Sequence, residues 1–188
     1  KITQTCVKGQ KEILKKLDIH YNFFDYESDY LKKSKKILEK LKKTGKLHKD
    51  KDGRLYLDQS DTELKKMMKS PVFVLTRSDE TGLYPLRDIV YTIDKLKISQ
   101  KNLIVLGEDQ KLYFLQLKET LKILGYSSPE IIHYSFILLS NHGKSKKMST
   151  RKGDVVLLED FLDEVIKKAD KEIKKRKTKG DPRIVGVS

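Results

Sequence analysis

The run Lys147-Met148-Ser149-Thr150-Arg151-Lys152-Gly153 contains the residue types best suited to chemistry in this sequence. It offers a hydroxyl group, backbone amides and a glycine hinge between cations, and it stands between an expected strand and an expected helix. Such a loop can close over a triphosphate, because ammonium and guanidinium groups stabilise the charge that grows at phosphorus in a transition state. An arbitrary run of this composition is more often a solvated basic turn, so the residues alone leave both interpretations open.

Tyr84 and Asp88 form a second candidate group. Pro85 suits the first position of a helix, so Tyr84 is expected at the N-cap or beside it. The four-residue spacing places the phenol and the carboxylate on one side of the first turn, where a carboxylate can bind a planar guanidinium through two hydrogen bonds. The plain alternative is that Asp88 complements the helix N-terminus and Tyr84 fills a surface gap. We assign no role to Arg87, which is expected to face solvent or a structural partner.

Gln110 is a third candidate, although a single glutamine after a strand is usually an ordinary loop residue. It follows one of three short apolar runs that alternate with two amphipathic helix patterns. The runs are Val72–Leu75, Leu103–Leu106 and Ile131–Leu139. This alternation predicts a parallel sheet with crossover helices, in which ligands bind at the carboxyl ends of the strands. All three candidate groups follow an expected strand.

The flanking segments are expected to be simpler. Before residue 71 we expect a helix over 8–17, an aromatic strand over Tyr21–Tyr26, a helix capped by Ser28 and stopped by Gly45, a hairpin of 46–49 and 54–58, and a polar connection over Gln59–Ser70. After residue 157 we expect a helix that starts near Asp160, a linker over Thr178–Pro182, and an end, Ile184–Ser188, that is too short to fold alone.

Composition narrows the class of protein. The 188 residues carry 41 Lys plus Arg against 27 Asp plus Glu, with basic flanks around a neutral centre over 71–140. This pattern gives slight support to a polyanionic partner, because lysine excess also marks solvated helix faces. The single Cys6 excludes an internal disulfide and indicates a reducing compartment. No apolar run is long enough to span a membrane, so no membrane association is expected.

Lys147, Met148 and Ser149 match the first three positions of Lys-Met-Ser-Lys-Ser, the second motif of class I aminoacyl-tRNA synthetases. The continuation through Thr150, Arg151 and Val-Val-Leu-Leu-Glu-Asp resembles the arginyl-tRNA synthetase version. Three other segments are similar to that family: Leu83-Tyr84-Pro85-Leu86-Arg87-Asp88-Ile89-Val90, Val105-Leu106-Gly107-Glu108-Asp109-Gln110, and, more weakly, Asp25-Tyr26-Glu27-Ser28. The family often has a histidine where this sequence has Tyr113. The resemblance extends over roughly residues 12–175.

The resemblance implies an arginine–tRNA ligase, which activates L-arginine with ATP and transfers it to the 3′ end of tRNA(Arg) in the cytoplasm. Tyr84, Asp88 and Gln110 would bind L-arginine. Lys147, Met148, Ser149, Thr150 and Arg151 would bind ATP, with Lys147, Ser149 and Arg151 as the catalytic residues. ATP would enter with Mg²⁺ as a substrate, and neither a tightly bound cofactor nor a protein metal site is expected.

The implied fold is α/β, namely the second half of a Rossmann-like parallel sheet with crossover helices, preceded by a small α+β connecting segment. We expect that connecting segment at residues 1–70. The second half of the catalytic domain, with its loop at 147–151, would occupy residues 71–160. The start of a helical anticodon-binding region would occupy residues 161–188.

The His-x-Gly-His motif that class I synthetases use to bind ATP is absent from these 188 residues. We therefore expect an incomplete and inactive piece of a longer enzyme, which also agrees with Lys1 as the first residue. One alternative is a non-catalytic RNA-binding or interaction module derived from a class I synthetase. Another is a different class I synthetase or nucleotidyltransferase, whose pocket would lack the Asp88 carboxylate.

Overall fold

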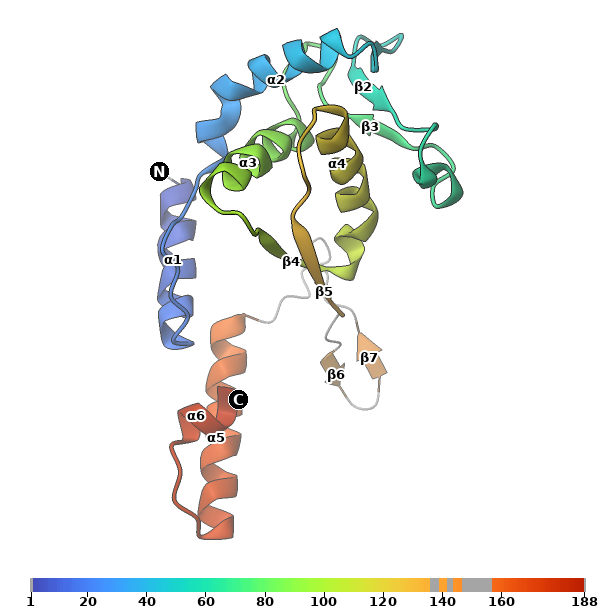
Figure 1. The fold of residues 1–188 in the computed structure, drawn as a ribbon. Helices are drawn as coiled ribbons and strands as arrows, with labels where there is room; N and C mark the ends of the chain where they lie inside the picture. The colour runs from blue at the N-terminus through green and yellow to red at the C-terminus, as the bar shows by residue number, and fades with distance from the viewer. Residues whose placement is uncertain (1, 136–138, 142–143, 147–156, 188) are drawn as a thin grey trace. The chain divides into compact units, whose positions relative to one another are not determined.

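The computed structural model describes residues 2–135, 139–141, 144–146 and 157–187 (Figure 1). The chain divides into two compact units. The middle unit comprises residues 25–136, and the terminal unit comprises residues 1–24 together with 137–188. The loop at 147–151 lies outside the described residues, so the predictions made for it are not tested by the structure.

The middle unit begins with a 3-10 turn at Glu27–Tyr30, the helix α2 (Leu31–Lys43) and the strands β1 (Leu47–Lys49) and β2 (Leu55–Asp58). It continues with a 3-10 turn at Glu63–Lys66, the strand β3 (Val72–Val74) and the helix α3 (Tyr84–Ile98). The strand β4 (Leu103–Gly107), a 3-10 turn at Glu108–Gln110, the helix α4 (Lys111–Ile123) and the strand β5 (Glu130–Tyr134) complete it.

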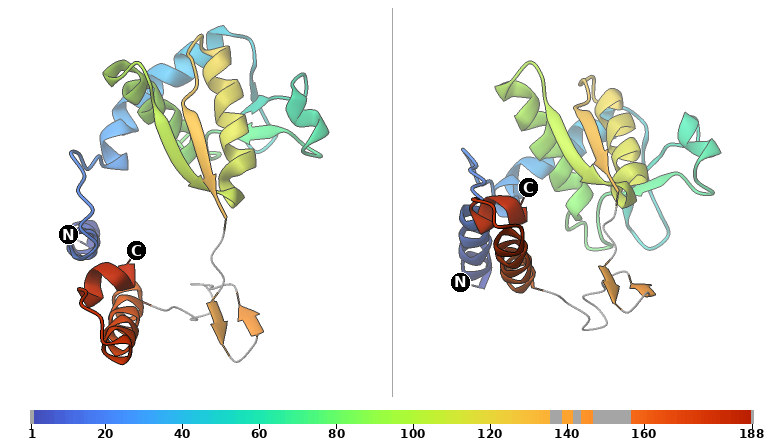
Figure 2. Two further views of the ribbon diagram at one scale, coloured as in Figure 1. Left: turned by 60° about the horizontal axis from the view of Figure 1, so that its bottom comes forward. Right: turned by 90° about the horizontal axis from the view of Figure 1, so that it is seen from below.

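Strands β4 and β5 are parallel, with Leu103 opposite Glu130 and Gly107 opposite Tyr134. Helix α4 connects them and packs against α3, and Figure 2 shows α4 alongside β5. This strand–helix–strand crossover is the predicted α/β arrangement. Strand β5 ends at Tyr134, before the predicted limit of Leu139, and residues 136–138 lie outside the described part.

The first predicted strand pairs differently from our expectation. Strand β3 lies antiparallel to β2, with Phe73 opposite Leu57, in a three-stranded sheet of order β1-β2-β3. The backbone N–H of Gln59 donates to the backbone carbonyl of Pro71 at 3.0 Å. This hydrogen bond joins the two ends of the segment between β2 and β3, so that β3 lies at the free edge of β2. An apolar run of this length does not reveal which edge it will pair with. Within the described residues the parallel sheet therefore has two strands, β4 and β5.

Two predictions for the residues around the boundary at position 24 were wrong. Residues Tyr21–Tyr26 form no strand, because aromatic residues favour a strand only where a partner strand is available, and Phe23 instead remains 77% exposed. Ser28 does not cap the following helix, since it lies inside the 3-10 turn and α2 begins at Leu31.

The predicted hairpin is confirmed, with Leu47 opposite Leu57. The predicted stop is also confirmed, because Gly45 has a φ of +70° just after α2.

The hydrophobic core of the middle unit is formed by buried aliphatic and aromatic side chains of α2, the three-stranded sheet, α3 and α4. Its most buried members are Leu41, Leu57, Leu75, Leu86, Ile89, Leu117 and Leu121. The polar segment that begins at Gln59 also reaches this core. Gln59 is fully buried, and its side-chain Nε2 donates to the backbone carbonyl of Gln116 at 2.8 Å. Composition did not predict this contact, because glutamine is usually exposed.

The terminal unit contains α1 (Ile2–Lys16), β6 (Leu139–Asn141), β7 (Lys144–Lys146), α5 (Leu158–Arg176) and α6 (Pro182–Val187). Helix α5 begins close to the predicted start and buries Leu162 and Ala169. The end of the chain, expected to be too short to fold alone, forms α6 and packs on α5. A side chain on Gly186 would come within 3.3 Å of the Ile166 backbone, so glycine allows the two helices to approach. Among the described helices, none combines the length and the apolar character that crossing a bilayer requires.

The paired strands β2 and β3 lie on opposite sides of residue 70, so the middle unit includes parts of two of the predicted segments. The predicted boundaries at residues 70 and 160 were drawn for a complete catalytic domain, so they stay predictions.

Candidate functional site

The start of α3 is set by its sequence. Leu83 is the extended N-cap residue, Tyr84 is the first helical residue, and Pro85 occupies the first turn, where a missing N–H costs nothing. The apolar stripe through Leu86, Ile89, Val90 and Ile93 is buried. Burial of this stripe turns the opposite face of α3 toward the surface.

That opposite face lines a pocket of about 330 Å³. Four of its residues lie on α3 at helical spacing, namely Tyr84, Arg87, Asp88 and Tyr91. The other lining residues, Asp25, Glu27 and Tyr30, come from the segment that precedes α2. The pocket thus has three carboxylates, one guanidinium and three phenols in a chain with a formal net charge of +14.

Asp88 is held by a tyrosine of the next helix. The Tyr113 hydroxyl donates to Oδ2 of Asp88 at 2.8 Å, and the Tyr113 ring lies 5.1 Å from the Tyr84 ring between centroids. Burial is the largest cause that raises the pKa of Tyr113 far above its usual range, and the Asp88 charge adds to it. The phenol therefore stays protonated and donates. No lysine or arginine within the described ranges forms an ion pair with Asp88.

Glu27 differs from Asp88 in having a cation of the protein as its partner. It forms an ion pair with Nε of Arg87, whose Nη1 donates to the carbonyl of Gly82 at 2.6 Å. Arg87 therefore has structural partners, as one of the two alternatives in the sequence analysis predicted. Glu27 is paired directly with a cation, whereas Asp88 accepts a neutral hydroxyl and interacts with the Lys95 ammonium without forming an ion pair.

Asp25 interacts with a third tyrosine. Burial first, and then a hydrogen bond with Asp25, raise the pKa of Tyr91 to about 12. The Tyr91 ring packs against Tyr30 at 5.0 Å between centroids, and the Lys95 ammonium lies 4.2 Å from its centre. Burial lowers the pKa of Lys95. Tyr91 therefore keeps its proton to a higher pH than a free phenol does.

The structure brings two of the predicted site residues together, since Tyr84 and Asp88 line the same pocket. Gln110 lies at the end of the 3-10 turn before α4 and contacts Asp109, 3.4 Å from its Oδ2. Gln110 is not among the side chains that line this pocket in the described part of the chain. Lys147, Met148, Ser149, Thr150 and Arg151 lie outside the described residues.

Sequence reasoning missed several lining residues. Tyr91 lies seven residues after Tyr84, so the same helical spacing that pairs Tyr84 with Asp88 could have identified it. Glu27 and Asp25 belong to the segment that weakly resembles the family's Glu-Ser pair, but no local pattern indicates that this segment returns to α3. Tyr30 gave no signal of its own.

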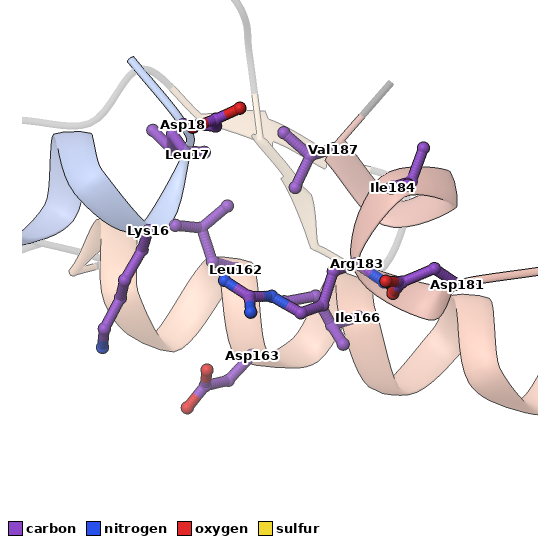
Figure 3. Close-up of a pocket in the computed structure, with 10 residues that line it drawn as sticks. All are labelled: Lys16, Leu17, Asp18, Leu162, Asp163, Ile166, Asp181, Arg183, Ile184 and Val187. Carbon is purple, nitrogen blue, oxygen red and sulfur yellow. The ribbon is translucent and has the colours of Figure 1, made fainter. Parts of the chain in front are cut away.

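A second pocket, of about 630 Å³, lies in the terminal unit between the end of α1, α5 and α6 (Figure 3). Leu17, Leu162 and Val187 face this space, and an ion pair between Lys16 and Glu159 joins α1 to α5. Its lining combines these apolar side chains with charged residues of both signs, namely Lys16, Asp18, Asp163, Asp181 and Arg183. The pocket on α3 offers carboxylates with aromatic walls, which suit a planar organic cation. Among the described residues, no cluster of histidine, cysteine or carboxylate side chains could hold a metal ion.

Solved structures define the class of fold. Arginyl-tRNA synthetase from Thermus thermophilus superposes with a TM-score of 0.69 at 19% identity, over 95% of this chain and 36% of that chain. The arginyl-tRNA synthetase of Plasmodium falciparum superposes with a TM-score of 0.67 at 16% identity, over 93% of this chain and 28% of that chain. At these identities the likeness concerns the fold alone, and it covers 36% and 28% of the two solved chains.

Sequence relatives identify the family. The model of tRNA synthetases class I (R), catalytic domain, matches residues 1–182, and the chain belongs to this family. The arginine–tRNA ligase of Methanocaldococcus jannaschii is 41% identical over 173 residues, which are 91% of this chain and 29% of that protein. That of Methanococcus aeolicus is 39% identical over 173 residues, 91% of this chain and 28% of that protein. The chain spans less than a third of the length of these relatives.

Proposed function

We propose that this chain is the part of an arginine–tRNA ligase that binds the side chain of L-arginine. The observation that carries the proposal is the pocket on α3, where Asp88 forms no ion pair among the described residues and stands beside Tyr84. A guanidinium would form the ion pair that Asp88 lacks and pack its flat face on the phenol ring.

The same arrangement supports selectivity for arginine over lysine. A carboxylate can accept two parallel hydrogen bonds from a guanidinium but only one well-directed bond from an ammonium. Each charge-assisted bond contributes about 1.5–3 kcal/mol. Gln110 would contact the bound arginine from the start of α4, a role that rests on the family resemblance alone.

In the complete enzyme, a carboxylate oxygen of arginine attacks the α-phosphorus of Mg-ATP, and pyrophosphate leaves as the adenylate forms. The terminal ribose hydroxyl of tRNA(Arg) then attacks the arginyl carbonyl, and AMP leaves. Lys147 and Arg151 would neutralise the phosphate charge and Ser149 would anchor the loop, as their match to the family motif suggests. We place this reaction in the cytoplasm, where the single Cys6 would stay reduced.

These 188 residues contain no His-x-Gly-His motif, and we propose that they form no adenylate alone. ATP–pyrophosphate exchange with L-arginine and tRNA tests both halves of the proposal. The complete enzyme that carries this chain should exchange only with arginine, and the 188-residue chain should not exchange. Robust exchange by the short chain would refute the second half. A complete protein that binds RNA but never exchanges would instead support the non-catalytic module.

A further inference from the structure

Tyr113 lies behind the pocket rather than in it. Its hydroxyl donates to Oδ2 of Asp88 at 2.8 Å, yet Tyr113 is not among the lining residues in the described part of the chain. Its ring is fixed between two other rings, 5.1 Å from Tyr84 and 5.6 Å from Phe73. Because Phe73 is buried on β3, residues of β3, α3 and α4 together determine where the Tyr113 hydroxyl lies.

The bond from Tyr113 leaves the charge of Asp88 intact. An ionised carboxylate accepts about four hydrogen bonds, so Oδ1 and a second lone pair of Oδ2 stay available for a ligand. A neutral phenol orients the carboxylate without neutralising it. The ion pair between Arg87 and Glu27 has the opposite effect in the same pocket, since it satisfies Glu27 with a cation of the protein.

We infer that Tyr113 is a positioning residue for arginine, whose hydroxyl fixes the Asp88 carboxylate in the orientation that receives the guanidinium. This inference rests on the proposed function and assigns the role to a residue that does not touch the substrate. An Asp88 side chain without this bond would have more rotamers to lose on binding, so arginine would bind more weakly. The chemical step at the α-phosphate would be unaffected, because Tyr113 acts only on the side-chain end of the substrate.

The test is ATP–pyrophosphate exchange by the complete enzyme with tRNA present, comparing wild type with Tyr113→Phe. The substitution removes the hydroxyl and keeps the ring that packs on Tyr84 and Phe73. We expect the KM for arginine to rise roughly tenfold, with kcat and the KM for ATP within about threefold of wild type. Tyr126→Phe is the matched control, since it removes a phenol that contacts Lys40 outside the pocket, and it should leave the KM for arginine unchanged.

A double-mutant cycle separates positioning from a general structural role. In an Asp88→Ala background, adding Tyr113→Phe should change kcat/KM for arginine by less than about twofold, because the group on which Tyr113 acts is gone. Equal effects in both backgrounds, or an unchanged arginine KM in the single variant, would overturn the inference. If wild-type enzyme fails to exchange with arginine, the proposed function itself fails, which is a separate outcome. Thermal unfolding of each variant shows that the compared proteins are folded.

Discussion

At the scale of single residues, Asp88 and Glu27 show why a carboxylate in a pocket is not by itself a binding group. Both line the same cavity, but Glu27 is paired with Arg87, whereas Asp88 receives a neutral hydroxyl and keeps its charge. The spacing of Tyr84 and Asp88 on one helical turn was readable from the sequence, because Pro85 fixes where the helix begins. The partnership of Asp88 with Tyr113 was not, because it joins side chains of two helices that only the fold brings together.

Replacing Asp88 with asparagine tests the residue-scale account. In the complete enzyme, Asp88→Asn removes the charge and keeps the shape, so the KM for arginine should rise at least about tenfold while kcat changes much less. The preference for arginine over lysine should fall as well. Asp94→Asn on the same helix is the control, since Asp94 pairs with Lys33 and Lys97 and is not among the described residues that line the pocket. If Asp88→Asn leaves selectivity untouched, the assignment of the pocket to arginine is wrong.

At the scale of elements, the turn between β1 and β2 and the direction of β4 and β5 could be predicted from the sequence, but the strand with which β3 pairs could not. The turn between β1 and β2 was readable because Asp50 accepts hydrogen bonds from the amides of Asp52 and Arg54, and Gly53 adopts a φ of +85°. The parallel direction of β4 and β5 followed from the length of the helix between them. The antiparallel position of β3 depended on contacts of Gln59 and Pro71 that no short pattern encodes. The roles of Lys147 and its neighbours stay predictions.

The contact of Tyr91 on α3 with Asp25 and Tyr30 predicts that the stability of the fold falls at alkaline pH. The pKa of Tyr91 is about 12 in the folded chain against about 10 for a free phenol, so the folded chain holds the proton more tightly. Its contribution to stability is complete below about pH 10 and is lost as the pH rises toward 12. Urea unfolding should therefore show a smaller alkaline loss of stability for Tyr91→Phe than for wild type. Tyr134→Phe, which removes an exposed phenol, should behave as wild type does. Identical pH profiles for all three proteins would contradict the account.

At the scale of the molecule, one unit carries both the core and the candidate site. Every residue of the main hydrophobic cluster and every residue that lines the α3 pocket lies between positions 25 and 136. We therefore expect the middle unit to fold alone, since it has its own hydrophobic core. Composition and charge predicted none of this division, because the boundary at residue 24 has no linker composition.

A protein of residues 25–136 tests this independence. It should unfold cooperatively in urea, with a free energy of unfolding within about 1 kcal/mol of the corresponding transition in the 188-residue chain. Tyrosine fluorescence can follow the transition, since the chain has no tryptophan. Leu117→Ala in the core should lower that free energy by about 2–5 kcal/mol in both proteins. A gradual, non-cooperative loss of structure in the shorter protein would show that the core needs the terminal unit.

A crystal structure of the complete enzyme with L-arginine bound would test the central claim most directly. We predict the guanidinium in the α3 pocket, with a nitrogen about 3 Å from an oxygen of Asp88 and its plane against Tyr84, while the Tyr113 hydroxyl still donates to Oδ2. Arginine bound elsewhere, or an Asp88 carboxylate turned away from the ligand, would contradict the account.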